Sequence, residues 1–130
     1  MLETFTKEER LCLKKLISRL FKEGSSSVVP PFRYRWLFVL LENPYPAQLL
    51  ISVPRTSFSR AVDRNLLKRR IREAYRKQKT VLYDSLNASR RQMIVAITYT
   101  GHEILPFPEI QEKIIVILQR LTKEVEKAAE

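Results

Sequence analysis

The spacing of apolar residues predicts a helix near the start of the chain. Thr6 and Glu9 fit a capping box, in which each side chain satisfies the other's free backbone amide. Gly24 is expected to end the helix, since glycine is favoured just after a last helical turn. Between these points, large apolar residues recur at helical spacing at Leu13, Leu16, Ile17, Leu20 and Phe21.

Three segments have the composition of strands. Residues 33–41 and 93–99 are rich in aromatic and β-branched types, and residues 48–53 form a third short apolar run. The serine- and proline-containing stretch 25–31 is expected to be a loop, and residues 42–47 a turn.

Two further helices complete the pattern. One should begin after Ser59 as N-cap and run to about Lys79. The other should span residues 109–127, with an apolar stripe that includes Ile114 and Leu118. The predicted order is α-β-β-α-β-α, without repeats or an internal linker. It indicates an α+β protein, a small sandwich of helices on a sheet, in one domain over residues 1–130.

Charge changes this picture from a generic small domain to one with a polyanionic partner. The chain has 24 Lys and Arg against 14 Asp and Glu, a formal net charge of +10. Ten of these cations and two acids lie between Arg55 and Lys79, a local net charge of +8. Such a basic region favours nucleic acid first and an anionic membrane surface second.

Several classes of site are excluded by residue usage. A single cysteine, Cys12, has no internal disulfide partner, and with the single histidine, His102, it does not make a zinc site. We expect Cys12 to be a buried or half-buried filler and His102 to be a surface residue. Two glycines leave no phosphate-binding glycine loop. No catalytic residue is assigned, and a cytoplasmic protein without a membrane segment is expected.

The long basic helix separates into two faces when its residues are placed about 100° apart. The packing face is predicted to carry Leu67, Ile71, Ala74, Gln78, Val81 and Leu82. The opposite, basic face is predicted to carry Asn65, Lys68, Arg69, Arg72, Arg76 and Lys79, with Arg64 at its edge.

This basic face is either a solvated helix surface or a binding surface for phosphates. Like charges four residues apart destabilise a helix by roughly 0.2–0.5 kcal/mol per pair, and only Asp63 and Glu73 lie nearby to offset them. Arginine, which binds phosphate bidentately, outnumbers lysine. Polyanion binding is therefore favoured, although this argument does not separate RNA from DNA.

The spacing within the helix carries a second signal. The pattern A-V-x-R-N-x-x-K-R-x-x-R-E runs from Ala61 to Glu73 and closely resembles the RNR motif of the bacterial ribonuclease P protein subunit. The preceding L-L-I-S-V-P, the first helix ending in F-K-E-G and the aromatic strand after it also match that family. One position departs from the motif, because Leu66 replaces the second arginine of R-N-R; it falls off the basic face.

The resemblance implies a ribonucleoprotein enzyme. In this family a catalytic RNA with bound Mg²⁺ removes the 5′ leader from precursor tRNA, and the protein supplies affinity and positioning. The fold would contain a left-handed βαβ crossover, although such crossovers are right-handed in about 98% of cases. Residues expected to contact the catalytic RNA are Arg60, Arg64, Asn65, Lys68, Arg69, Arg72 and Arg76. Mg²⁺ is expected mainly on the RNA, and DNA is not an expected partner.

The family also holds the single-stranded leader in a cleft between its first helix and the sheet. The matching residues here are Phe21, Trp36 and Phe38, whose rings could stack on unpaired bases. Tyr34, Trp36 and Phe38 alternate along the strand and therefore share one face of the sheet. An aromatic stripe on a strand is more often part of the core than a binding surface. Tyr34 is expected in the core, and both interpretations stay open for Trp36 and Phe38.

Three other kinds of protein share some of these features. A structural RNA-binding protein resembling a ribosomal protein would have the same charge and fold class, but not the A-V-x-R-N spacing. A helix-turn-helix protein would need a short helix and tight turn before the basic helix, which is not predicted. Membrane attachment by the basic helix is least favoured, because its apolar face is needed for the sheet.

Overall fold

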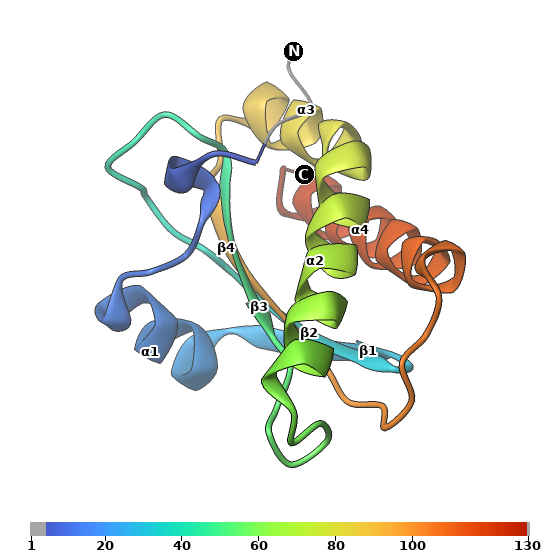
Figure 1. Ribbon diagram of the computed structural model, residues 1–130. Helices are drawn as coiled ribbons and strands as arrows, with labels where there is room; N and C mark the ends of the chain where they lie inside the picture. The colour runs from blue at the N-terminus through green and yellow to red at the C-terminus, as the bar shows by residue number, and fades with distance from the viewer. Residues whose placement is uncertain (1–4, 130) are drawn as a thin grey trace.

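The centre of the fold is a sheet of four strands in the order β1-β2-β4-β3 (Figure 1). The computed structural model describes residues 5–129. β1 and β2 are antiparallel, β2 and β4 are antiparallel, and β3 runs parallel to β4. The α+β class predicted from the sequence is confirmed. The strands are β1 (Ser25–Val29), β2 (Phe32–Phe38), β3 (Ala47–Ser52) and β4 (Met93–Tyr99).

Helices cover both faces of the sheet. One face packs on α1 alone, in a small core that contains Leu20, Ile94 and Ala96. The opposite face packs on the other three helices in a larger core, to which β4 contributes Val95 and Ile97. Burial on both faces explains why β4 is apolar along nearly its whole length. The helices are α1 (Lys14–Glu23), α2 (Ala61–Gln78), α3 (Thr80–Ser89) and α4 (Phe107–Ala129).

The two parallel strands are joined by the basic helix. β3 leads into α2, α3 follows, and the chain returns as β4 beside β3, with Ala47 opposite Met93 and Ser52 opposite Thr98. This is the βαβ unit that the family resemblance implies, with two helices in its crossover. Its left-handedness stays a prediction.

The predicted loop at 25–31 is wrong, because residues 25–29 form β1. Serine has little preference for strands, so the three serines of this segment do not predict one. The strand forms because each of its residues pairs with one in β2, from Ser25 with Trp36 to Val29 with Phe32. Tertiary pairing therefore overrides local propensity at this edge of the sheet.

The N-terminal helix is also shorter than predicted. The Glu9 carboxylate accepts a hydrogen bond from the Thr6 N–H (2.7 Å), but it caps only the 3-10 turn η1 (Lys7–Glu9). An extended segment follows, in which Arg10 bridges to Leu49 on β3, and α1 begins only at Lys14. Gly24 ends α1 as predicted. Cys12, predicted to be at least half-buried, is exposed.

The long basic helix ends at Gln78 and a separate helix, α3, follows Lys79 with a changed axis (Figure 1). A single wheel over residues 59–82 therefore fails beyond this junction. Val81, predicted to pack, is 63% exposed, whereas Lys79, predicted on the basic face, is 1% exposed. The N-cap of α2 is Arg60 rather than Ser59.

Candidate nucleic-acid interface

The outward face of α2 carries most of the predicted RNA-binding residues. Leu67, Ile71 and Ala74 are fully buried against the core, which fixes the rotation of the helix. Residues on the other side must then face solvent. Arg60, Asn65, Arg69 and Arg72 are exposed and Lys68 is half-buried.

Arg60, Arg69 and Arg72 have guanidinium groups that are available to a ligand. Within residues 5–129, none of these three guanidinium groups takes part in a hydrogen bond or an ion pair of the folded chain. Each guanidinium presents a planar set of donors suited to phosphate oxygens. We call these three arginines with Asn65 and Lys68 the α2 stripe.

Arg64, predicted to contact RNA, is used within the protein. Its Nη1 donates to the carbonyl oxygens of Phe58 (2.9 Å) and Ser59 (2.8 Å). The loop before α2 is thereby tied to the first turn of the helix. Arg64 therefore helps to position the start of the α2 stripe.

Arg76 is likewise engaged, in a bidentate pair with Glu73. Its Nε donates to Oε2 at 3.0 Å and its Nη2 to Oε1 at 2.6 Å. The hydrogen bonds from Arg76, with the charge of Lys77 nearby, hold the pKa of the Glu73 carboxyl below its usual value. The far end of α2 is therefore less positive than the count of its arginines suggests.

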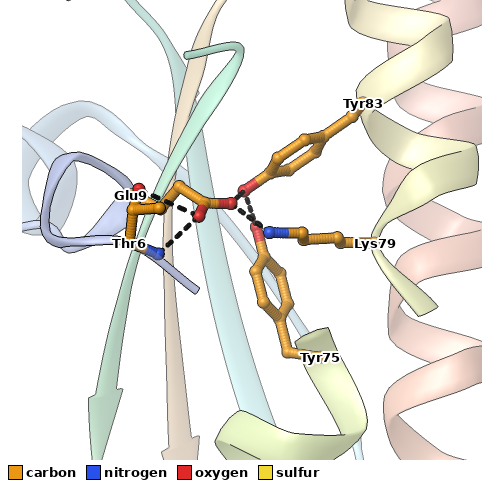
Figure 2. A network of polar contacts seen from close by, with 5 residues as sticks. All are labelled: Thr6, Glu9, Tyr75, Lys79 and Tyr83. Carbon is orange, nitrogen blue, oxygen red and sulfur yellow. Dashed lines mark hydrogen bonds and ion pairs between the residues drawn. The ribbon is translucent and has the colours of Figure 1, made fainter. Parts of the chain in front are cut away.

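Lys79 does not belong to the basic face, which corrects the sequence prediction. It forms a buried ion pair with Glu9, and Glu9 Oε1 also accepts from the Tyr83 hydroxyl at 2.7 Å (Figure 2). The Tyr75 hydroxyl donates to that of Tyr83 at 3.2 Å. This buried network joins the N-terminal turn to the α2–α3 junction.

The directions of the pKa shifts in the buried network indicate that Glu9 is a carboxylate and that the Tyr83 hydroxyl is protonated. Burial by itself would raise the pKa of Glu9, but hydrogen bonds from Lys79, Thr6 and Tyr83 outweigh it and hold that pKa below its usual value. Burial, together with Tyr75 and the Glu9 carboxylate, raises the pKa of Tyr83 strongly. The Tyr83 hydroxyl therefore stays protonated and donates to Glu9.

The predicted leader-binding residues do not come together. Phe21 lies on α1, which covers the face of the sheet that carries Leu37. Trp36 and Phe38 point to the other face, where they pack at the margin of the larger core. The assumption that all three rings line one cleft is therefore wrong. Tyr34 is buried in that larger core, as predicted.

Beside Phe21 the structure places Arg35 instead. The Arg35 guanidinium carbon lies 4.9 Å from the centre of the Phe21 ring, and Phe21 remains 46% exposed. Arg33, two residues earlier on the same face of β2, is exposed. Neither arginine is among the predicted site residues, although the alternation of β2 places both on the face opposite Trp36. The signal that could have found them was Leu37, the apolar residue in phase with them.

Two other features, a metal-binding cluster and a membrane-spanning helix, are absent among residues 5–129. No group of three or more His, Cys, Asp or Glu side chains in this range is arranged to hold a metal ion. None of the helices in the same range is long and apolar enough to cross a membrane.

A basic helix that presents one arginine-rich face, on a small α+β sheet, is typical of a nucleic-acid-binding protein. The family model described as Ribonuclease P matches residues 5–122. The ribonuclease P protein component of Porphyromonas gingivalis is 32% identical over 124 residues, covering 95% of this chain and 90% of that protein. That of Thermotoga petrophila is 31% identical, covering 93% and 98%.

A solved structure agrees with these relatives. The ribonuclease P protein from Thermotoga maritima superposes with a TM-score of 0.69 at 26% identity, covering 86% of this chain and 96% of that one. The chain belongs to the ribonuclease P protein family. It is thus an accessory protein subunit of an RNA-processing ribonucleoprotein, and the alternative of a structural RNA-binding protein without a ribozyme partner is not favoured.

Proposed function

We propose that the α2 stripe binds the catalytic RNA of ribonuclease P and that the protein thereby supports removal of the 5′ leader from precursor tRNA. The observation that carries this proposal is the outward face of α2. Arg69 and Arg72 are exposed there, Arg60 is exposed at the N-cap of α2, and their guanidinium groups have no partner in the described part of the chain. Phosphates would neutralise the charge of these three arginines.

The leader of precursor tRNA is proposed to lie on the α1 side of the sheet, beside Phe21 and Arg35. Phe21 offers an exposed ring for stacking, and Arg35 with the exposed Arg33 offers cations for the backbone. Stacking tolerates any base, which suits a subunit that meets many leaders. In this proposal Phe21 remains a leader-binding residue, and Arg33 and Arg35 take the place of Trp36 and Phe38.

Chemistry is proposed to reside in the RNA. Mg²⁺ would be bound mainly by that RNA, and the protein would raise affinity and fix the position of the substrate. Arg64 would contribute by holding the loop before α2 in place, through its bonds to the Phe58 and Ser59 carbonyls.

The stripe is tested by the salt dependence of binding to the catalytic RNA. Arg69→Ala/Arg72→Ala should weaken binding and flatten the slope of log affinity against log salt by about two units, about one per lost phosphate contact. Lys14→Ala/Lys15→Ala is the matched control, because it removes two exposed charges from α1. Equal slopes for the two variants would mean that the stripe faces solvent in the complex.

The leader surface is tested with precursor tRNA that carries or lacks a leader, bound to the assembled ribonucleoprotein. Phe21→Leu should weaken binding of the leader-bearing form about tenfold, within the range of base stacking, and leave the leaderless form unchanged. Phe107→Leu is the control, since that ring lies on α4 near Lys77. Equal effects on the two substrates would remove Phe21 from the leader site.

A further inference from the structure

A row of aromatic residues on β2 emerges from the core on the face away from α1. Tyr34 is buried, whereas Trp36 and Phe38 are only partly buried. The Trp36 indole stacks on the Tyr34 ring, with centroids 5.4 Å apart and planes inclined by 25°. The row therefore begins inside the protein and ends at its surface.

The neighbouring strand leaves this row uncovered. Ser27 pairs with Tyr34 and Ser25 with Trp36, so the β1 residues opposite the rings are small and polar. β1 starts at Ser25, and Phe38 has Met93 of β4 as its only strand neighbour in the described sheet. Large apolar residues at these β1 positions would have closed the row.

The end of α4 also fails to cover the rings. Leu121 and Val125 are buried in the core, but the residues of α4 beside Trp36 and Phe38 are Glu124, Lys127 and Ala128. Together with Ser25 they line a hollow of about 340 Å³. A second hollow of about 330 Å³ shares Phe38 and is lined by residues that follow β2, Val39 and Leu40, and by residues between α3 and β4, Arg90, Arg91 and Gln92.

Cations surround the two hollows. The Arg91 guanidinium carbon lies 5.3 Å from the centre of the Phe38 ring, and its Nη2 donates to the Ala128 carbonyl at 2.8 Å. Arg90 is exposed, and the Lys127 side chain is 75% exposed. Among the lining residues the single acid is Glu124, 3.6 Å from the Lys127 ammonium. Partly exposed rings bordered by cations match the chemistry of single-stranded nucleic acid.

We propose that Trp36 and Phe38, with Arg90 and Lys127, form a second contact surface for single-stranded RNA. Unpaired bases stack on the two rings, and the cations contact the flanking phosphates. This surface lies on the opposite side of the sheet from Phe21, so it is separate from the leader surface proposed above. Because the leader is proposed to lie on the α1 side of the sheet, the RNA segment on this opposite face is assigned to the catalytic RNA.

Trp36 is the only tryptophan of the chain, so tryptophan fluorescence reports on the surroundings of this residue. Titration of the isolated protein with a short unstructured oligoribonucleotide should quench that fluorescence, because a stacked base quenches indole emission. Binding is followed independently by the anisotropy of a dye on the oligoribonucleotide. Unchanged Trp36 emission at saturation would overturn the proposal.

Three variants separate direct stacking from an indirect effect. Lys127→Gln should weaken the quenching several-fold, whereas Lys14→Gln, which removes one exposed charge from α1, should leave it unchanged. Phe21→Leu should also leave it unchanged. Loss of quenching in Phe21→Leu would show that the RNA acts from the leader surface and would overturn a second site.

The source of the RNA is assigned with the catalytic RNA and with precursor tRNA. Quenching on addition of the catalytic RNA alone identifies that RNA as the ligand. Quenching that appears only when leader-bearing precursor joins the complex would assign this surface to the leader and overturn its assignment to the catalytic RNA. Trp36→Leu should weaken the identified interaction about tenfold and Trp36→Phe should preserve it. Failure of both RNAs to quench would overturn the proposal while leaving the α2 stripe untouched.

Discussion

Replacing Lys79 by methionine should remove one half of the buried ion pair at the α2–α3 junction. Lys79 and Glu9 are each 1% exposed, and Glu9 also accepts from the Tyr83 hydroxyl. Without Lys79, the Glu9 carboxylate would stay buried with neutral donors only. Breaking one side of a buried pair costs about 3–5 kcal/mol, a large part of the ~5–15 kcal/mol that stabilises a typical domain.

A double-mutant cycle measures the coupling. Glu9→Leu should cost a similar amount, because it leaves the Lys79 ammonium without its carboxylate. Glu9→Leu/Lys79→Met should cost no more than the costlier single variant, since two apolar side chains of similar size need no counter-charge. The coupling energy should then be about 3 kcal/mol, measured by urea unfolding at constant m-value. Additive costs would show that the two side chains do not meet.

The same pair predicts a pH dependence. The folded-state pKa of Glu9 lies below its value in the unfolded chain, so the unfolded chain takes up the proton at higher pH. The contribution of Glu9 is fully present above its unfolded pKa of about 4.3 and is lost as the pH falls through the folded value. Glu9→Gln should therefore flatten the acid limb of the stability curve. An unaltered acid limb would mean that Glu9 is not held as a carboxylate.

Two further predictions follow from single contacts. Gly24→Ala should lower the free energy of unfolding by about 1–3 kcal/mol, because the added Cβ would lie 2.4 Å from the Leu20 carbonyl oxygen on α1 and 3.0 Å from the Trp36 carbonyl oxygen on β2. An equally stable variant would contradict this tight packing around Gly24. Arg64→Ala should lower the free energy of unfolding by about 1–2 kcal/mol, because it removes two hydrogen bonds to backbone carbonyls. Arg69→Ala should change it little. Thermal unfolding of the two variants measures the difference, and equal losses of stability would argue against the contact of Arg64 with the loop.

Sequence reasoning succeeds where local pattern and burial agree. β4 occupies residues 93–99 as predicted, because its apolar run is buried on both faces. Within α2, the packing residues Leu67, Ile71 and Ala74 follow from helical spacing alone. Helical periodicity does not identify the RNA partner; the resemblance to the family motif does.

The failures come from contacts between residues that are distant in sequence. Lys79 is buried in an ion pair with Glu9, which lies seventy positions earlier in the sequence. A helical wheel of one helix does not contain that partner. β1 exists through pairing with β2, and its serines give no strand signal. The side of β2 that meets α1 depends on the docking of that helix. The alternation of side chains along β2 therefore predicts that Trp36 and Phe38 share one face of the sheet. It does not predict that Phe21 lies over the opposite face.

The central claim is that this chain serves a catalytic RNA through the α2 stripe, and reconstitution of leader removal tests it most directly. The protein alone should not cleave precursor tRNA. Together with its ribonuclease P RNA at low Mg²⁺ it should restore cleavage that the RNA lacks under those conditions. Arg69→Ala/Arg72→Ala should restore it only at higher protein concentration. No stimulation by the wild-type protein would contradict the claim, and full stimulation by the variant at wild-type concentration would remove the stripe from it.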